Sequence, residues 1–159
     1  MPEAQSESDR RCVIVRHFDA PVRLVFKCYS EPEQLLQWFG PGNYPLTHCT
    51  MDFRVGGEIE MMMTGPDGPG PKFGGKYLEI EPNQRIVYTN QFLHERGTEE
   101  PMVVTLTFEE ADGGTKLTVD TLFATVEQAR RHMDMGYEGG VGVGLDQLAA
   151  YLPKLGGDA

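Results

Sequence analysis

The sequence predicts an α+β fold, in which an antiparallel sheet is followed by a long C-terminal helix. Between residues 47 and 123, apolar and polar residues alternate in short segments separated by Gly, Pro and Asn, a pattern typical of consecutive strands. Helical patterns occur only directly after the first strand and at the C-terminal end. Because no helix separates the later strands, we expect an antiparallel meander rather than a parallel sheet.

The length of 159 residues, with 40% hydrophobic and 24% charged residues, fits one globular domain. Residues 1–10 are polar and are expected to form a flexible N-terminal tail, followed by a single domain over residues 11–155. The N-terminus lacks the apolar core of a signal peptide, and no segment approaches the ~20 apolar residues of a membrane span. The expected location is therefore cytoplasmic.

The net charge of −10 argues against a nucleic-acid partner and against docking on an anionic membrane surface. Three cysteines, Cys12, Cys28 and Cys49, have no CxxC spacing. They are expected to be buried structural thiols, with a single reactive thiol as the alternative.

The first elements are a strand and two short helices. Residues 11–18 (RCVIVRHF) are rich in β-branched side chains and predict a strand. Asp19 is the expected N-cap of a helix over residues 22–29, which has a proline in its first turn. Ser30 and Glu33 match a capping box, which predicts a second short helix that stops at a Gly-Pro-Gly sequence.

The sheet continues through segments in which the apolar residues recur at every second position. Gly56-Gly57 and the proline-rich segment 65–71 separate the first of these strands, and Asp112-Gly113-Gly114 is a strong hairpin signal. The predicted strands span residues 47–55, 58–64, 72–81, 84–93, 102–110 and 115–123.

The last predicted element is a helix from Thr125 to about Leu152, with Pro153 beyond its end. It begins with a capping box formed by Thr125 and Gln128. Its apolar residues recur at spacings of three and four, and this stripe is expected to face the sheet. The stripe consists of Tyr137, Val141, Leu145, Leu148 and Leu152.

Five glycines lie in this helical segment, and each interior glycine costs about 1 kcal/mol relative to alanine. One explanation is a close approach of the helix backbone to the sheet or to a bound molecule. The other is a break near residue 136 that leaves two shorter helices. Either arrangement leaves few side chains on this wall and room for a cavity. The glycines are Gly136, Gly139, Gly140, Gly142 and Gly144.

Strand alternation identifies residues that would line such a cavity from the sheet, with Tyr137 and Val141 closing it from the C-terminal helix and Trp38 from the short helices, although any one of them could simply fill a solid core. Asn90 and Thr121 are informative, because an inward polar side chain needs a hydrogen-bond partner. The candidates are Trp38, Met51, Phe53, Met61, Met63, Tyr88, Asn90, Phe92, Leu106, Phe108, Val119, Thr121, Tyr137 and Val141.

No sequence motif indicates a catalytic, metal or cofactor site. Residues 70–76 follow the G-x-x-x-x-G-K pattern of a phosphate loop, but Tyr77 replaces the required Ser or Thr and the segment leads into a strand. The four histidines lack the spacing of a metal site. We therefore expect no catalytic residue, no metal and no cofactor. Acid–base chemistry in the cavity would depend on Tyr88, Asn90, His132 or Glu138.

Taken together, several segments resemble the SRPBCC, or START-like, superfamily, which includes birch-pollen-allergen-like and polyketide cyclase-like proteins. The resemblance is to the branch of the activator of heat-shock protein Hsp90 ATPase homologue, and it covers residues 11–153. It implies a helix-grip fold, in which a curved antiparallel sheet wraps around the long C-terminal helix and encloses a deep apolar cavity. The segments are FDAP, EPEQLLQWFGP, DFRVGG, GKYLEIEP, RIVYT, VTLTFEEADGGTKLT and LDQLAAYL.

Two positions depart from this branch. Trp38-Phe39 stands where a tryptophan pair is frequent, and Gly140-Val141 stands where Gly-Trp is common. The second departure removes a large ring from the expected cavity wall, so the resemblance implies a roomier pocket there.

These observations favour the binding of a small apolar or amphipathic ligand, such as a lipid, sterol or polyketide-like molecule, between sheet and helix. One alternative is an enzyme of polyketide cyclase or hydrolase type acting on such a ligand. A second is a co-chaperone that stimulates a heat-shock ATPase, which a single domain without a further partner-binding module disfavours. A homodimer formed through an exposed edge strand is a further expectation.

Overall fold

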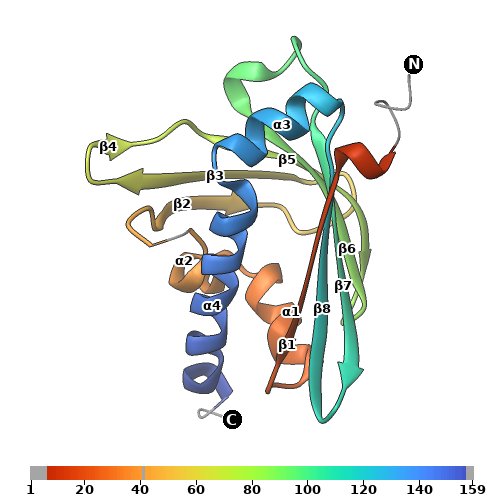
Figure 1. Cartoon of the computed structure of the whole chain (residues 1–159). Helices are drawn as coiled ribbons and strands as arrows, with labels where there is room; N and C mark the ends of the chain where they lie inside the picture. Colours follow the sequence, from red (N-terminus) through yellow and green to blue (C-terminus); the bar gives the residue numbers. More distant parts are fainter. Residues whose placement is uncertain (1–6, 41, 157–159) are drawn as a thin grey trace.

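The structure is a computed structural model that describes residues 7–40 and 42–156. A curved antiparallel sheet faces three shorter helices and one long C-terminal helix (Figure 1), which confirms the predicted α+β fold. The sheet order is β1-β8-β7-β6-β5-β3-β2, with β4 paired to β3.

The bounds of the elements follow the predicted segments closely. The strands are β1 Arg11–Phe18, β2 Leu46–Met51, β3 Glu58–Gly65, β4 Gly68–Pro69, β5 Phe73–Glu81, β6 Arg85–Phe92, β7 Met102–Ala111 and β8 Gly114–Leu122. The α-helices are α1 Val22–Ser30, α2 Pro32–Trp38, α3 Val126–Asp134 and α4 Tyr137–Gly156, and the short 3-10 segments are η2 Glu7–Arg10 and η3 Leu93–Glu95.

The N-terminal tail and the end of β2 differ from the sequence-based expectation. Residues 1–6 of the predicted tail lie outside the described residues, whereas Glu7–Arg10 form the turn η2. The Arg10 guanidinium donates a 2.7 Å hydrogen bond to the carbonyl of Phe123. The strand predicted to reach residue 55 ends at Met51, and Phe53 lies in the connection to β3.

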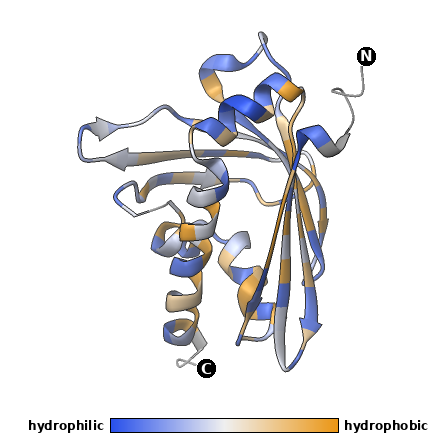
Figure 2. Ribbon diagram, viewed as in Figure 1, coloured by the Kyte–Doolittle hydropathy of each residue, from blue (hydrophilic) through white to orange (hydrophobic). Residues whose placement is uncertain are grey.

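The β7–β8 hairpin forms where Asp112-Gly113 predicted it. Asp112 and Gly113 have φ angles of 50° and 80°, the left-handed values that a tight hairpin turn requires and that Asp-Gly adopts readily. Figure 2 shows apolar and polar positions alternating along the strands, so one face of the sheet is apolar. That face packs on α1 and α4, and its buried residues include Ile86, Leu106 and Leu117.

Only one of the three predicted helix caps is present. The Thr125 hydroxyl accepts a 3.0 Å hydrogen bond from the Gln128 amide, as the capping box predicted. The predictions for Asp19 and Ser30 were wrong, because the caps of α1 and α2 are Pro21 and Glu31 and neither makes a side-chain capping bond. In both cases the N-cap residue has extended backbone and a proline lies at the helix start, as the N-cap Pro21 of α1 and as the first residue Pro32 of α2.

The C-terminal helical segment breaks near residue 136, the second of the two explanations for its glycines. Helix α3 ends before Met135, Gly136 has a φ of 88°, and α4 begins at Tyr137. A close approach of the helix backbone to the sheet is not seen there, because a Cβ atom added at Gly139 or Gly144 would meet nothing within 4 Å, whereas a close approach to a bound molecule stays a prediction. Helix α4 also continues through Pro153 to Gly156, beyond the predicted end at Leu152.

Hydrogen bonds link the C-terminal half of α4 to α2 and the residues just after it. The Gln147 amide nitrogen donates to the carbonyls of Trp38 and Gly40 at 2.8 and 2.6 Å. The Tyr151 hydroxyl donates to the Gln34 side chain. Leu145 and Leu148 on the same helix are buried in the core, as the apolar stripe predicted. Among the described residues, the N-terminal half of α4 makes no side-chain hydrogen bond to α2, and the cavity lies beneath this half.

Candidate ligand cavity

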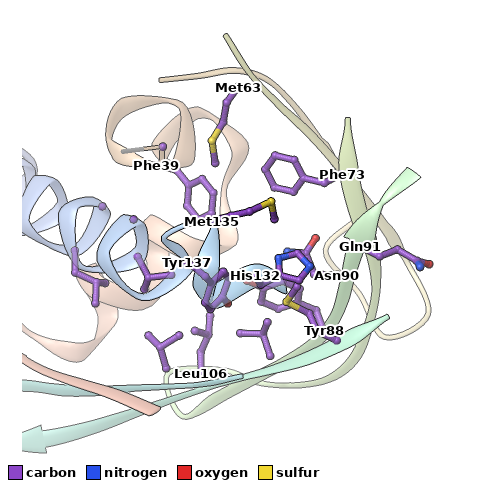
Figure 3. Close-up of a pocket in the computed structure, with 18 of the residues that line it drawn as sticks. Phe39, Met63, Phe73, Tyr88, Asn90, Gln91, Leu106, His132, Met135 and Tyr137 are labelled. Carbon is purple, nitrogen blue, oxygen red and sulfur yellow. The ribbon is translucent and has the colours of Figure 1, made fainter. Parts of the chain in front are cut away.

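A cavity of about 340 Å³ lies between the concave face of the sheet and the first half of α4. Strands β6, β7 and β8 form its floor, while α2, the end of α3 and the start of α4 form its walls. Figure 3 shows side chains from the sheet and from the helices converging on this space. Its volume falls in the lower part of the range for small-molecule sites.

Nine of the fourteen predicted cavity residues line this space, and five do not. The nine are Trp38, Met63, Tyr88, Asn90, Phe92, Leu106, Val119, Tyr137 and Val141. The five elsewhere are Met51, Phe53, Met61, Phe108 and Thr121.

The five outlying residues are engaged in the core or in a neighbouring void. Phe53 and Phe108 pack edge-to-face on Phe26, with ring centroids 6.0 and 5.2 Å apart. Met61 lines a second void of about 20 Å³, which is too small for more than a water molecule. Met51 accepts a weak hydrogen bond from the Tyr77 hydroxyl at 3.9 Å.

Several lining residues were missed by sequence reasoning. Met102 and Val104 share the inward face of β7 with Leu106, so the same alternation could have found them. Others come from helix ends and loops, where alternation carries no information. The missed residues are Tyr29, Phe39, Gly40, Phe73, Gln91, Met102, Val104, His132, Met135, Gly136, Gly140, Gly144 and Leu145.

The helical wall of the cavity is built from glycine. Gly140 and Gly144 are four residues apart on α4 and both line the cavity, so they share one face of the helix, and Gly136 lines the cavity at the break before α4. Adding a Cβ atom at Gly144 would place it in open space. Val141, which stands beside Gly140, also lines the cavity with a small side chain. The missing side chains on this face leave the space that the cavity occupies.

One end of the cavity carries the polar groups, and most of them are unpaired. The Tyr137 and Thr121 hydroxyls hydrogen-bond to each other at 2.7 Å. By contrast, the Tyr88 hydroxyl, the Asn90 amide and the His132 ring nitrogens have no hydrogen-bond partner among the described residues. Figure 3 shows Tyr88, Asn90 and His132 on the same side of the cavity.

The position of His132 is set by aromatic stacking. Its ring stacks on Phe92 and Phe123, with centroids 6.1 and 5.5 Å away, and meets the Tyr137 ring edge-on at 6.1 Å. Burial lowers the pKa of His132 below its usual value, and the nearby Arg131 adds to this effect. The imidazole is therefore neutral at physiological pH, with one donor and one acceptor nitrogen.

The tyrosines of the cavity are also neutral. Burial raises the pKa of Tyr137 to about 12, although the bond with Thr121 acts in the opposite direction. Burial raises the pKa of Tyr88 well above its usual value. Among the described residues that line the cavity there is no Asp, Glu, Lys or Arg, so the site offers no formal charge to a ligand.

Two other site types find no support in residues 7–40 and 42–156. No group of three or more His, Cys, Asp or Glu side chains is placed there to hold a metal ion. No helix in that part of the chain is long and apolar enough to cross a membrane.

A curved antiparallel sheet closed by a C-terminal helix around an apolar cavity defines the helix-grip class of the SRPBCC superfamily, a fold that commonly binds hydrophobic ligands. Within it, the chain belongs to the family described as activator of Hsp90 ATPase homolog 1-like protein, which matches residues 19–153. Both findings confirm the resemblance seen in the sequence.

Solved structures of similar proteins share the fold over nearly the whole chain. A Nitrosomonas europaea protein has a TM-score of 0.85 at 26% identity, over 96% of this chain and 99% of its own. An Arthrobacter aurescens protein has a TM-score of 0.85 at 29% identity, over 94% and 89%. A Mycobacterium smegmatis protein has a TM-score of 0.83 at 27% identity, over 94% and 95%. No curated protein matches the chain.

Proposed function

We propose that this protein binds a small, mostly apolar molecule in the cavity beneath α4, acting in the cytosol as the sequence suggests. The observation that supports this most directly is the 340 Å³ cavity itself, because a pocket of this size lined mostly by apolar and aromatic side chains is typical of small-molecule sites. On this wall Gly144 faces the cavity at a position where an added Cβ atom would meet nothing within 4 Å. Burial of apolar ligand surface against Met63, Phe92 and Leu106 supplies the driving force.

The proposal is tested by titrating the protein with N-phenyl-1-naphthylamine, a neutral apolar dye whose fluorescence rises in apolar surroundings. We expect saturable binding that Val141→Trp abolishes, because the indole ring enters the cavity. Val143→Trp is the matched control, since Val143 lies on the same helix but is 41% exposed and does not line the cavity. Equal binding by both variants, or no binding by the parent protein, would overturn the proposal.

Binding is better supported than catalysis. Of the four groups considered for acid–base chemistry, Tyr88, Asn90 and His132 line the cavity, whereas Glu138 does not. His132 is the strongest base among the three, but no carboxylate or carbonyl orients its ring within the described residues. General bases are normally held in one tautomer by such a partner. Mass spectrometry of small molecules released from protein purified from its native host would identify the ligand and show whether it is chemically altered.

The family description raises a second candidate, stimulation of a heat-shock ATPase. An ATPase assay with the chaperone of the same organism tests it. Stimulation that survives Val141→Trp would assign this activity to a surface other than the cavity.

A further inference from the structure

Asn90 is a polar residue placed on the apolar floor of the cavity. It lies on β6 between Tyr88 and Phe92, which share its face of the strand, and it pairs with Met102 of β7. Its Oδ1 atom is buried and has no hydrogen-bond partner among the described residues. The Asn90 amide nitrogen also has no hydrogen-bond partner among the described residues. Buried polar groups in native proteins are nearly always paired, so this amide requires an explanation.

The neighbours of Asn90 share its lack of partners. The His132 ring stacks on Phe92, the next inward residue of β6, which places the imidazole at the same end of the cavity. The Tyr88 hydroxyl lies two residues away on the same strand face. Figure 3 shows these three side chains converging on one region, opposite the apolar side chains of Phe39 and Met63. The cavity thus has an apolar end and an end with three neutral polar groups that have no hydrogen-bond partner among the described residues, of which the Asn90 oxygen is buried.

The absence of charge restricts the ligand. No Lys or Arg among the described residues lines the cavity, so a carboxylate or phosphate would lose its hydration without gaining a cationic partner. No Asp or Glu there would balance an ammonium group. A neutral hydroxyl group suits the site, since it donates to the Asn90 oxygen or accepts from the amide nitrogen. The oxygen is covered in this structure, but rotation about the broad terminal torsion of Asn90 turns it into the cavity.

Resting on the proposed binding function, we infer that the ligand is a neutral hydrophobic molecule bearing a hydroxyl group, and that Asn90 recognises this hydroxyl with His132 and Tyr88 beside it. A phenol or an alcohol on an apolar ring system fits this description. Fatty acids and other anions do not.

Three probes of one shape test the inference: 2-naphthol, 2-methoxynaphthalene and 2-naphthoate, titrated at pH 7.5 by isothermal calorimetry. We expect 2-naphthol to bind roughly tenfold more tightly than its methyl ether, the difference that one well-formed hydrogen bond in an apolar site provides. We expect 2-naphthoate to bind more weakly than either.

The variant Asn90→Leu replaces the amide by an apolar side chain of similar shape. It is expected to bind 2-methoxynaphthalene at least as tightly as the parent protein and to bind 2-naphthol within about twofold of that affinity. Asn90→Ala serves as a second variant in case leucine distorts the floor. Thr105→Val is the control, because Thr105 lies on the opposite face of β7 from Val104 and Leu106 and does not line the cavity.

The outcomes separate the two proposals. Equal binding of 2-naphthol and its methyl ether by the parent protein overturns the hydroxyl inference and leaves ligand binding supported. A preference for 2-naphthol that persists in both Asn90 variants also overturns it. If none of the three probes binds, the inference fails, and the dye titration of Val141→Trp decides separately whether the cavity binds ligands at all.

Discussion

Replacing Gly144 by leucine should stabilise the fold and weaken ligand binding at the same time. A leucine at this helical position recovers about 0.8–1 kcal/mol of helix propensity. Its side chain has space to enter, because a Cβ atom there meets nothing within 4 Å and Gly144 faces the cavity. Burial of the new side chain adds about 1.5–3 kcal/mol. Even if strain removes part of this gain, the melting temperature should rise by several degrees, at about 2–4 °C per kcal/mol for a chain of this size.

The same side chain should obstruct the ligand. Four added carbon atoms, each taking about the ~30 Å³ share of a water molecule, occupy on the order of 100 Å³ of a cavity of about 340 Å³. Binding of N-phenyl-1-naphthylamine should weaken at least tenfold, measured by fluorescence titration, while scanning calorimetry records the higher melting temperature. Gly139→Leu is the matched control, since Gly139 is exposed on the same helix and outside the cavity. It should gain only the propensity contribution and bind normally. A Gly144→Leu protein that melts lower, or that binds the dye as the parent does, would refute this account of the glycine face.

Three further predictions concern the break, the thiols and pH. Gly136→Ala should destabilise the protein by about 1–2 kcal/mol in urea unfolding, because the φ of 88° at Gly136 disfavours any side chain. Gly139→Ala should instead stabilise it. A change in stability of the same sign for both variants would contradict the break at Gly136. Burial raises the pKa of Cys28 to about 12 and that of Cys49 to about 11, so a thiol reagent at pH 8 should label them far more slowly in the folded protein than in urea. Burial lowers the pKa of His132 in the folded protein, so its contribution to the free energy of unfolding should be fully present above the unfolded pKa of about 6.5. This contribution should be lost as the pH falls from there through the folded pKa. His132→Gln should flatten that loss, and an unchanged pH profile of stability in the variant would exclude His132 as the cause.

The elements were predictable because their signals are local. Alternation identified the strands from β5 to β8, and Asp112-Gly113 fixed the β7–β8 turn through left-handed backbone angles that few residues adopt. The break at Gly136 was not decided by sequence, because a glycine-rich helix and a glycine-terminated helix share the same composition. Pro153 led to the wrong prediction that the helix ends at Leu152. A proline about one turn from the helix end interrupts few hydrogen bonds, so α4 continues past it to Gly156.

The cavity was only partly predictable because alternation gives the face of a strand but not the position along it. Leu106 and Phe108 share the inward face of β7, yet Leu106 lies beneath the cavity and Phe108 lies against α1, where it packs on Phe26 and Tyr29. Which end of the sheet stays open depends on where α1 and α4 cross it. That is a tertiary property, and no local pattern in β7 contains it.

The glycine face and the unpaired amide point to the same conclusion by different routes. Filling Gly144 with alanine should stabilise α4 by about 1 kcal/mol, and exchanging Asn90 for leucine should remove an unsatisfied acceptor worth about 1–3 kcal/mol. Each retained residue therefore lowers the stability of the empty protein. Stability of this kind is typically given up at positions that serve binding. A bound molecule that fills the space beside the glycines and hydrogen-bonds to Asn90 would offset both losses, whereas a cavity without an occupant would leave both unexplained.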